Sequence, residues 1–164
     1  MRPGDLSAAY SCPDCGAGPE LDHGRPGYLL HDAPAGLTLS LSRSRGWALL
    51  AAGAVRPHGT TVGIDLEHSS GVIFPGFDDV ALTPAERQLL AALAPDEAML
   101  WRTTAWARKE ALLKVRGTGL RIEPDSVEAY EEPGDGTMVV DLDTVALGLP
   151  PGFAGALAVV GTAE

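Results

Sequence analysis

The sequence predicts an α+β fold, because strand patterns at both ends enclose a helical middle. Apolar and polar residues alternate after Leu37, and a second strand pattern covers residues 62–67. Helix signals dominate residues 83–116, and short strand patterns between Pro and Gly turns return after Gly119. A chain of 164 residues suffices for one domain, or for two small halves that share a core.

Composition narrows the class of protein. Hydrophobic residues make up 45 % and charged residues 21 %, which excludes disordered and fibrous chains. No apolar run approaches the ~20 residues that cross a bilayer, and residues 1–30 contain Pro and Gly where a signal peptide needs an apolar core. The net charge of −10 argues against nucleic acid as a partner. We therefore expect a cytoplasmic protein that binds neither membrane nor nucleic acid.

Residues 1–36 are rich in Pro and Gly and show no clear periodicity, so we expect mostly loop there. Within them Cys12-Pro13-Asp14-Cys15 is followed by His23 and His31. The cysteine spacing suits zinc, but the histidines lie further downstream than in common zinc fingers. A zinc site at Cys12 and Cys15 therefore stays an alternative, and we favour two free thiols in a reducing compartment.

The region from Leu37 to Val55 predicts two strands joined by a tight turn at Arg45-Gly46. At the end of the first strand, Ser42-Arg43-Ser44 offers two hydroxyls and a guanidinium, a combination suited to phosphate. The alternative is a polar hairpin turn without a ligand. The strand at residues 62–67 follows closely, so we expect three neighbouring antiparallel strands.

Gly63-Ile64-Asp65-Leu66-Glu67 is the centre of the predicted site. Side chains two apart in a strand share a face, so Asp65 and Glu67 lie together and repel each other. A divalent cation such as Mg²⁺, which takes oxygen ligands, would relieve this repulsion. The alternative is a half-exposed strand with an acidic face.

Two helices are expected after a loop at residues 71–80. Thr83-Pro84-Ala85-Glu86 is a capping box that begins a helix ending near Leu93. A longer helix runs from about Glu97 to Arg116 and ends at Gly117. Trp106, Glu110 and Lys114 are spaced by four along it, so they form one stripe.

Positive charge is concentrated at the end of the longer helix. Six Arg and Lys residues face one acid between Trp101 and Arg121, and the chain's only two lysines, Lys109 and Lys114, lie there. A basic segment of this kind within an acidic chain suits a small anionic ligand, and Lys binds phosphate as a compact charge. The alternative for Glu110 and Lys114 is an ordinary surface pair.

The C-terminal third predicts strands at residues 126–130, 137–140 and 153–161. Five residues between Leu39 and Gly53 recur 108 positions later, as Leu147 to Gly161. This weak repeat favours two β-rich halves related by a pseudo-twofold axis. We accordingly expect a single domain over residues 1–164, with halves at about 1–67 and 82–164.

Taken together, Gly63-Ile64-Asp65-Leu66-Glu67 and the segment from Trp106 to Lys114 resemble the two signature motifs of the 4′-phosphopantetheinyl transferases. The family patterns are G-[IV]-D-[IV]-E and W-x-x-K-E-[AS]-x-x-K, and only Leu66 departs from them. His23-Gly24-Arg25-Pro26 and Ser42-Arg43-Ser44 resemble stretches of the larger, surfactin-synthase-activator-like type. That resemblance implies a first half shortened at its N-terminal end.

The resemblance implies transfer of 4′-phosphopantetheine from coenzyme A to a serine of an acyl or peptidyl carrier protein, with release of adenosine 3′,5′-bisphosphate. Asp65, Glu67 and Glu110 would hold Mg²⁺, or Mn²⁺, against the pyrophosphate, with Lys114 on the same phosphates. Glu110, or a water bound to the metal, would accept the serine proton. The implied coenzyme A contacts are Arg25, Ser42, Arg43, Ser44, Lys109 and Lys114.

Two hypotheses follow from the resemblance. The first is a cytoplasmic enzyme of secondary metabolite biosynthesis, of the holo-carrier-protein synthase type, acting as a monomer or homodimer. The second is a non-catalytic relative that binds coenzyme A or a carrier protein and serves as a partner subunit or regulator. The three acidic residues favour the enzyme, since a protein that only binds has no need of converging carboxylates.

Overall fold

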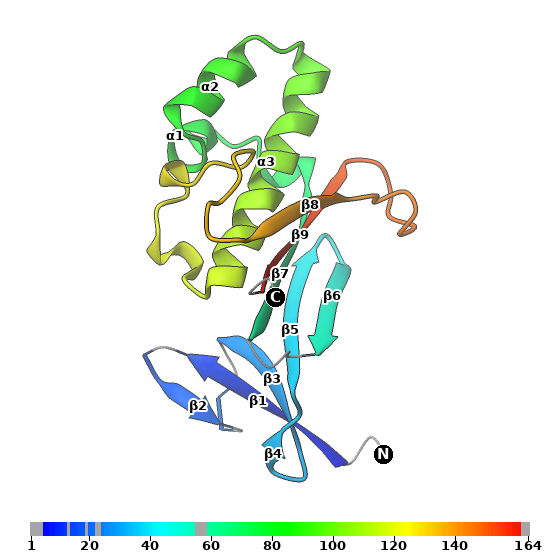
Figure 1. The fold of residues 1–164 in the computed structure, drawn as a ribbon. Helices are drawn as coiled ribbons and strands as arrows, with labels where there is room; N and C mark the ends of the chain where they lie inside the picture. Colours follow the sequence, from blue (N-terminus) through cyan, green and yellow to red (C-terminus); the bar gives the residue numbers. More distant parts are fainter. Residues whose placement is uncertain (1–4, 13, 19, 22–23, 55–58, 162–164) are drawn as a thin grey trace.

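A computed structural model describes residues 5–12, 14–18, 20–21, 24–54 and 59–161. Helices gather at one end of the molecule and a small sheet at the other (Figure 1). The strands are β1 (Leu6–Cys12), β2 (Gly16–Gly18), β3 (Arg25–Leu30), β4 (Ala33–Pro34), β5 (Leu37–Ser44), β6 (Trp47–Ala54), β7 (Thr60–His68), β8 (Met138–Leu142) and β9 (Phe153–Gly161). The helices are α1 (Phe77–Ala81), α2 (Pro84–Ala91) and α3 (Pro95–Arg116), with 3₁₀ turns η2 (Ser69–Gly71), η3 (Gly119–Arg121) and η4 (Pro124–Ser126). This arrangement confirms the α+β class.

The N-terminal region forms a sheet in the order β2-β1-β3-β4, so the expectation of mostly loop in residues 1–36 is wrong. Tight turns connect its strands. His31 and Asp32, between β3 and β4, both have positive φ, as a two-residue hairpin loop requires. The described side chains of these strands are exposed or half-buried, except that of Cys12, so no apolar alternation marks the strands in the sequence.

β5 and β6 form the predicted hairpin, closed by Arg45-Gly46. Arg45 and Gly46 have φ of 50° and 81°, as in a type I′ turn. β7, which the sequence predicts as the third strand beside this hairpin, has no backbone ladder with β5 or β6. β7 pairs instead with β9 over its whole length, in the sheet β7-β9-β8.

α3 packs on the β7-β9-β8 sheet and forms the largest described hydrophobic cluster with it. Small residues meet at this contact: Ala107 and Ala111 of α3 pack near Ala156 and Ala158 of β9. Larger side chains such as Leu112 fill the rest of the cluster. The small residues let the helix lie close to the sheet, which places the second signature motif beside the first.

The helical end agrees with the predicted boundaries and adds one helix. Thr83 caps α2 through a complete capping box with Glu86, and α3 ends at Gly117, whose φ is 72°. α1 lies within the predicted loop of residues 71–80 and extends one residue beyond it. None of the described helices is both long enough and apolar enough to cross a membrane.

The C-terminal strands are confirmed in β8 and β9, whereas the strand predicted at residues 126–130 is wrong. The backbone there binds side chains rather than another strand. The amide of Ala129 donates to Glu86 Oε1 at 2.8 Å, and its carbonyl accepts from Arg108 Nε at 2.6 Å. Because the amide and the carbonyl of Ala129 are both hydrogen-bonded already, a strand partner would add no backbone hydrogen bond at this residue.

Candidate functional site

Asp65 lies at the centre of the candidate site, in the middle of β7, and is 2 % exposed. Its Oδ1 accepts hydrogen bonds from Lys114 Nζ at 2.6 Å and from Ser42 Oγ at 2.8 Å. Lys114 Nζ also donates to the Ile64 carbonyl at 3.1 Å. β5 and α3 therefore hold the carboxylate from two sides.

Ser42 belongs to a hydroxyl row on β5, made of Thr38, Ser40 and Ser42. These hydroxyls accept from the amides of Val62, Ile64 and Leu66, at 3.2, 2.9 and 3.1 Å respectively. Because alternate amides of a strand point to one edge, the row satisfies one edge of β7 while β9 pairs with the other. Side chains thus replace the backbone ladder that was expected between β5 and β7.

Gly63 allows the strand and the helix to approach closely. A Cβ at this position would lie 2.1 Å from the carbonyl oxygen of Ala111 and 2.6 Å from the amide nitrogen of Val115. Both atoms belong to the backbone of α3, so they have little freedom to move aside. The glycine that opens the first motif is therefore required by packing.

Glu67 and Glu110 are half-buried, and the charge of Asp65 acts on both. Burial raises the pKa of Glu67 to about 7, and the charges of Asp65 and Glu110 add to this rise, while a hydrogen bond from Trp106 and the charge of Lys114 oppose it. Burial, and then the charge of Asp65, also raise the pKa of Glu110. These mutual effects show that the three carboxylates share one electrostatic environment, which a cation would stabilise.

One further observation indicates that the carboxylates of Asp65, Glu67 and Glu110 suit Mg²⁺. Asp65 Oδ2 is buried and has no hydrogen-bond partner, whereas Oδ1 of the same carboxylate has two. As placed, no three Asp, Glu, His or Cys side chains among the described residues are grouped tightly enough to bind a metal by themselves. Mg²⁺ commonly takes one or two carboxylates and completes its shell with water and substrate phosphates, so this partial set suits it.

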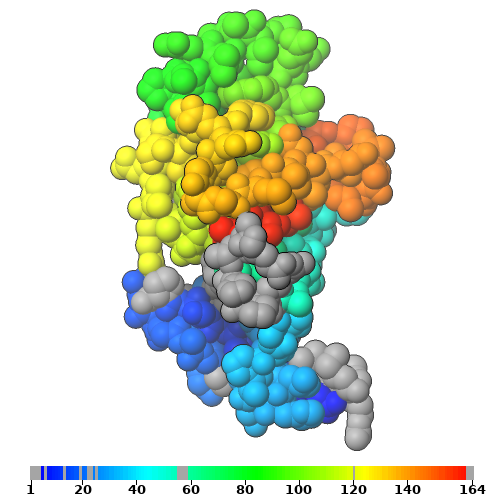
Figure 2. All heavy atoms as spheres, in the orientation of Figure 1, coloured from blue at the N-terminus to red at the C-terminus, as the bar shows by residue number. Residues whose placement is uncertain are grey.

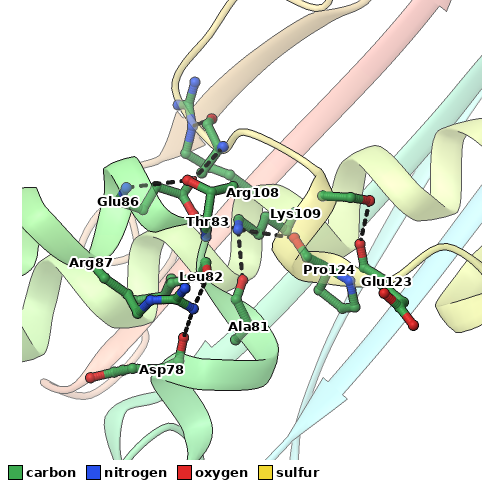
Figure 3. A network of polar contacts seen from close by, with 12 residues as sticks. Asp78, Ala81, Leu82, Thr83, Glu86, Arg87, Arg108, Lys109, Glu123 and Pro124 are labelled. Atoms are coloured by element: carbon green, nitrogen blue, oxygen red, sulfur yellow. Dashed lines mark hydrogen bonds and ion pairs between the residues drawn. The ribbon is translucent and has the colours of Figure 1, made fainter.

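Lys109, one of the two lysines of the second motif, is buried and paired inside the protein. Its side chain is 0 % exposed, and its ammonium reaches Glu86 Oε2 at 2.5 Å, the Ala81 carbonyl at 2.6 Å and the Pro124 carbonyl at 3.0 Å (Figure 3). These three partners match the three donors of an ammonium group. Lys109 therefore ties α3 to the α1–α2 end of this structure, and the coenzyme A contact that the motif implies for it stays a prediction.

The remaining predicted coenzyme A contacts lie in different surroundings. Ser42 is buried and bound to Asp65, whereas Arg43, one position further along β5, is exposed. Ser44 is half-buried at the end of the strand, where it pairs with Trp47. The backbone of Arg25 pairs with β1, but its side chain lies outside the described residues. Among those of these residues whose side chains are described, Ser42 is the one with a hydrogen bond to Asp65.

The basic segment is neutralised by acids from elsewhere in the fold. Each of its six cations has a carboxylate partner: Arg102–Asp78, Arg108–Asp141, Lys109–Glu86, Lys114–Asp65, Arg116–Asp135 and Arg121–Asp14. The basic segment is therefore paired with acids in this structure, and its binding of a small anionic ligand stays a prediction. An anionic ligand must compete with these carboxylates for the cations.

A cavity of about 730 Å³ lies where β1, β3, β5 and the end of α3 meet. Lys114 lines it, as do Arg116, Arg121 and the Gly117-Thr118-Gly119 segment. In the sequence this segment predicts a helix end, and Arg116 and Arg121 belong to the basic segment without a separate role. Arg116 is the last residue of α3 and Arg121 ends the following turn η3, so their closeness in sequence to Lys114 was the available signal.

Cys12 and Cys15 lie at the β1–β2 turn, and Cys12 lines the same cavity. Cys12 is buried and Cys15 is exposed, and hydrogen bonding to Cys12 raises the pKa of Cys15. No described residue completes a zinc site with them. His23, the nearer candidate ligand in the sequence, lies outside the described residues.

A family model of the 4′-phosphopantetheinyl transferase superfamily matches residues 61–148, which include Asp65, Glu67, Glu110 and Lys114. The match covers more than half of the chain. The protein therefore belongs to the 4′-phosphopantetheinyl transferase superfamily, as the two motifs predicted.

Comparison with solved structures gives a partial match to the holo-[acyl-carrier-protein] synthase of Thermotoga maritima. The two share 24 % identity over 63 % of this chain and 64 % of that one, with a TM-score of 0.48. The match thus spans less than two thirds of that synthase. The comparison with curated proteins found no match.

Proposed function

We propose that this protein transfers 4′-phosphopantetheine from coenzyme A to a serine of an acyl or peptidyl carrier protein, with Mg²⁺ or Mn²⁺. The serine oxygen attacks the phosphorus that carries pantetheine, and the bond from that phosphorus to the bridging oxygen breaks. Adenosine 3′,5′-bisphosphate leaves with the bridging oxygen, and the serine proton passes to a base. This balance needs no further reactant.

The observation that carries the proposal is that the two oxygens of the Asp65 carboxylate differ in their hydrogen bonding. Lys114 and Ser42 fix one oxygen, and the other oxygen is buried with no partner. A buried oxygen without a partner destabilises the folded protein, and a bound cation would remove this cost. We therefore infer that Oδ2 is a ligand atom. Asp65, Glu67 and Glu110 would hold the metal, which when bound would neutralise charge on the pyrophosphate.

The other residues act by position and charge. Lys114 lies between the Asp65 carboxylate and the cavity, where its ammonium would stabilise charge that develops on the leaving bisphosphate. Glu110, whose pKa is raised by burial, is our candidate for the acceptor of the serine proton. Ser42 would orient Asp65.

The direct test is mass spectrometry of a panel of apo carrier proteins after incubation with this protein, coenzyme A and Mg²⁺. Transfer adds phosphopantetheine to one carrier serine and must require the metal. If calorimetry shows coenzyme A binding but every carrier stays unmodified, the protein is the non-catalytic relative instead.

A further inference from the structure

β6 lies at the edge of its sheet but has the composition of a central strand. All residues of Trp47–Ala54 are apolar, yet none of them is buried. The weak repeat in the sequence aligns Leu49 and Gly53 of β6 with Leu157 and Gly161 of β9. β9 has a strand on each side, β7 and β8, whereas β6 has β5 alone. This comparison indicates that β6 has a second edge that is suited to pairing.

The register of the hairpin shows which backbone groups form this edge. The first residue pair of the hairpin lies directly beside a two-residue loop, where such a pair exchanges both backbone hydrogen bonds. Bonded and non-bonded pairs then alternate, so the amides and carbonyls of every second residue point away from β5. These residues are Ala48, Leu50, Ala52 and Ala54. No described residue is hydrogen-bonded to these outward groups, and Figure 1 shows β6 on the outer side of β5.

The other sheet edges in the described part of the chain are short, charged or covered. β2 has three residues, and β4 has two, one of which is Pro34. β8 carries Asp141 in an ion pair with Arg108, and the hydroxyl row of β5 covers one edge of β7. Short strands, Pro, charges and bulges are the usual means by which proteins prevent strand pairing. β6 has none of these features over its eight residues.

We propose that β6 pairs with β6 of a second copy of this chain, antiparallel across a two-fold axis, to form a homodimer. The edge carries no charge, so the axis brings no like charges together within the paired strands. An axis at Ala51 sets Leu50 opposite Ala52 of the second copy. The same axis sets Ala48 opposite Ala54, and the outward groups then form about eight backbone hydrogen bonds.

Pairing extends the β5–β6 sheet to four strands, two from each copy. A sheet of two strands is marginal by itself, and further strands stabilise it. Leu50, which is 62 % exposed, gains apolar neighbours. Figure 2 shows part of this hairpin, in cyan, at the surface of the molecule below the orange segment that follows β8. The inference goes beyond the proposed function, because no ligand takes part in the pairing.

Two variants test the edge, and a third is their control. Leu50→Lys should weaken the dimer by roughly 10²-fold or more, because each copy loses an apolar contact and two ammonium groups meet near the axis. Ala52→Pro removes an amide that points away from β5, so it should weaken the dimer by about tenfold or more and leave the hairpin folded. Leu100→Lys is the matched control. Leu100 is also 62 % exposed but lies on α3, so this variant should dimerise like wild type.

Sedimentation equilibrium of the full chain over a range of concentrations gives the dissociation constant of each variant. A reductant is present, because Cys15 is exposed and could join two copies. Amide hydrogen exchange locates the interface. In the wild-type dimer the amide of Ala52 should be protected like that of Ala51, which faces β5. In monomeric Leu50→Lys the amide of Ala52 should exchange roughly tenfold faster or more, whereas that of Ala51 stays protected.

Loss of the dimer in Leu50→Lys and Ala52→Pro, with a dimer kept in Leu100→Lys, supports the inference. A wild type that is monomeric at every concentration overturns it, whether or not the protein transfers phosphopantetheine. A dimer that both edge variants leave unchanged, or in which the amide of Ala52 exchanges freely, overturns it as well, because another surface then forms the contact. Assembly beyond the dimer also contradicts it, since a two-fold pairing occupies the edge in both copies and closes.

Discussion

Ser42 and Asp65 are joined by a buried hydrogen bond of 2.8 Å, although they lie on strands of different sheets. The same hydroxyl accepts the amide of Leu66 at 3.1 Å. Ser42→Ala should lower the free energy of unfolding by about 1–3 kcal/mol, because the amide is left unpaired, and should also weaken Mg²⁺ binding. Chemical denaturation and calorimetry with coenzyme A present measure the two effects.

Thr38→Val is the matched control for Ser42. It removes a hydroxyl that accepts the Val62 amide but does not touch Asp65. We expect a similar loss of stability with unchanged Mg²⁺ affinity. Equal weakening of Mg²⁺ binding by both variants would show that Ser42 has no special effect on the carboxylate.

Lys114→Ala should lower single-turnover transfer by roughly 10²-fold or more while weakening coenzyme A binding much less. The reason is that its ammonium would act on charge that grows as the phosphate bond breaks. Rapid-quench transfer to an apo carrier protein, paired with calorimetry, checks this. A variant that transfers as fast as an active wild type removes Lys114 from the reaction.

Glu67 makes stability and metal binding depend on pH. Its pKa is raised to about 7, so the folded state holds this proton more tightly than the unfolded chain does. The metal-free protein should therefore lose stability as pH rises from the ordinary carboxyl range through about 7, and then level off. Mg²⁺ should lower the pKa, since it favours the ionised form.

Carboxyl-carbon NMR across this pH range, with and without Mg²⁺, follows Glu67 directly. Glu67→Gln should reduce the pH-dependent step in the unfolding curves and leave the part that comes from Glu110, whose pKa is also raised. A Glu67 resonance that titrates at the same pH with and without Mg²⁺ would falsify the assignment of this residue as a metal ligand.

Lys109→Met should destabilise the protein by about 3–5 kcal/mol, because the buried Glu86 carboxylate loses its partner. The folded fraction should still bind coenzyme A with unchanged affinity. Arg116→Met, at an exposed pair, should change stability by about 1 kcal/mol or less. A Lys109→Met protein of normal stability that no longer binds coenzyme A would restore the ligand role expected from the motif.

Gly63→Ala should cost about 1–3 kcal/mol or more, because the added Cβ would meet the backbone of α3. Gly134→Ala is the matched control, since its Cβ would meet nothing within 4 Å and its φ is not positive. Thermal unfolding compares them. Similar stability of the two variants would mean that strand and helix can separate without loss.

Local signals in the sequence were enough to place α2, α3, the β5–β6 turn and the last two strands. The capping box at Thr83, the αL position at Gly117 and the turn at Arg45-Gly46 each depend on chemistry within a few residues. The two motifs also placed Asp65 and Lys114 in one site, and the fold brings them within 2.6 Å.

Long-range partners could not be predicted in this way. Arg108 and Arg121 formed part of an apparent excess of positive charge, and only the fold shows their acidic partners, Asp141 and Asp14. Lys109 has the sequence context of a ligand contact, but burial against Glu86 decides its role. Ala129 was expected in a strand because no sequence rule anticipates side chains that satisfy its backbone.

The hydroxyl row on β5 also specifies the alignment of the N-terminal part of the chain against the site. A slip of one residue would set Leu39 and Leu41, in place of hydroxyls, against the buried amides of β7. A slip of two would restore hydroxyls to some amides but would move Ser42 away from Asp65. The same three side chains therefore determine both the register of β5 against β7 and the hydrogen bond that orients the Asp65 carboxylate.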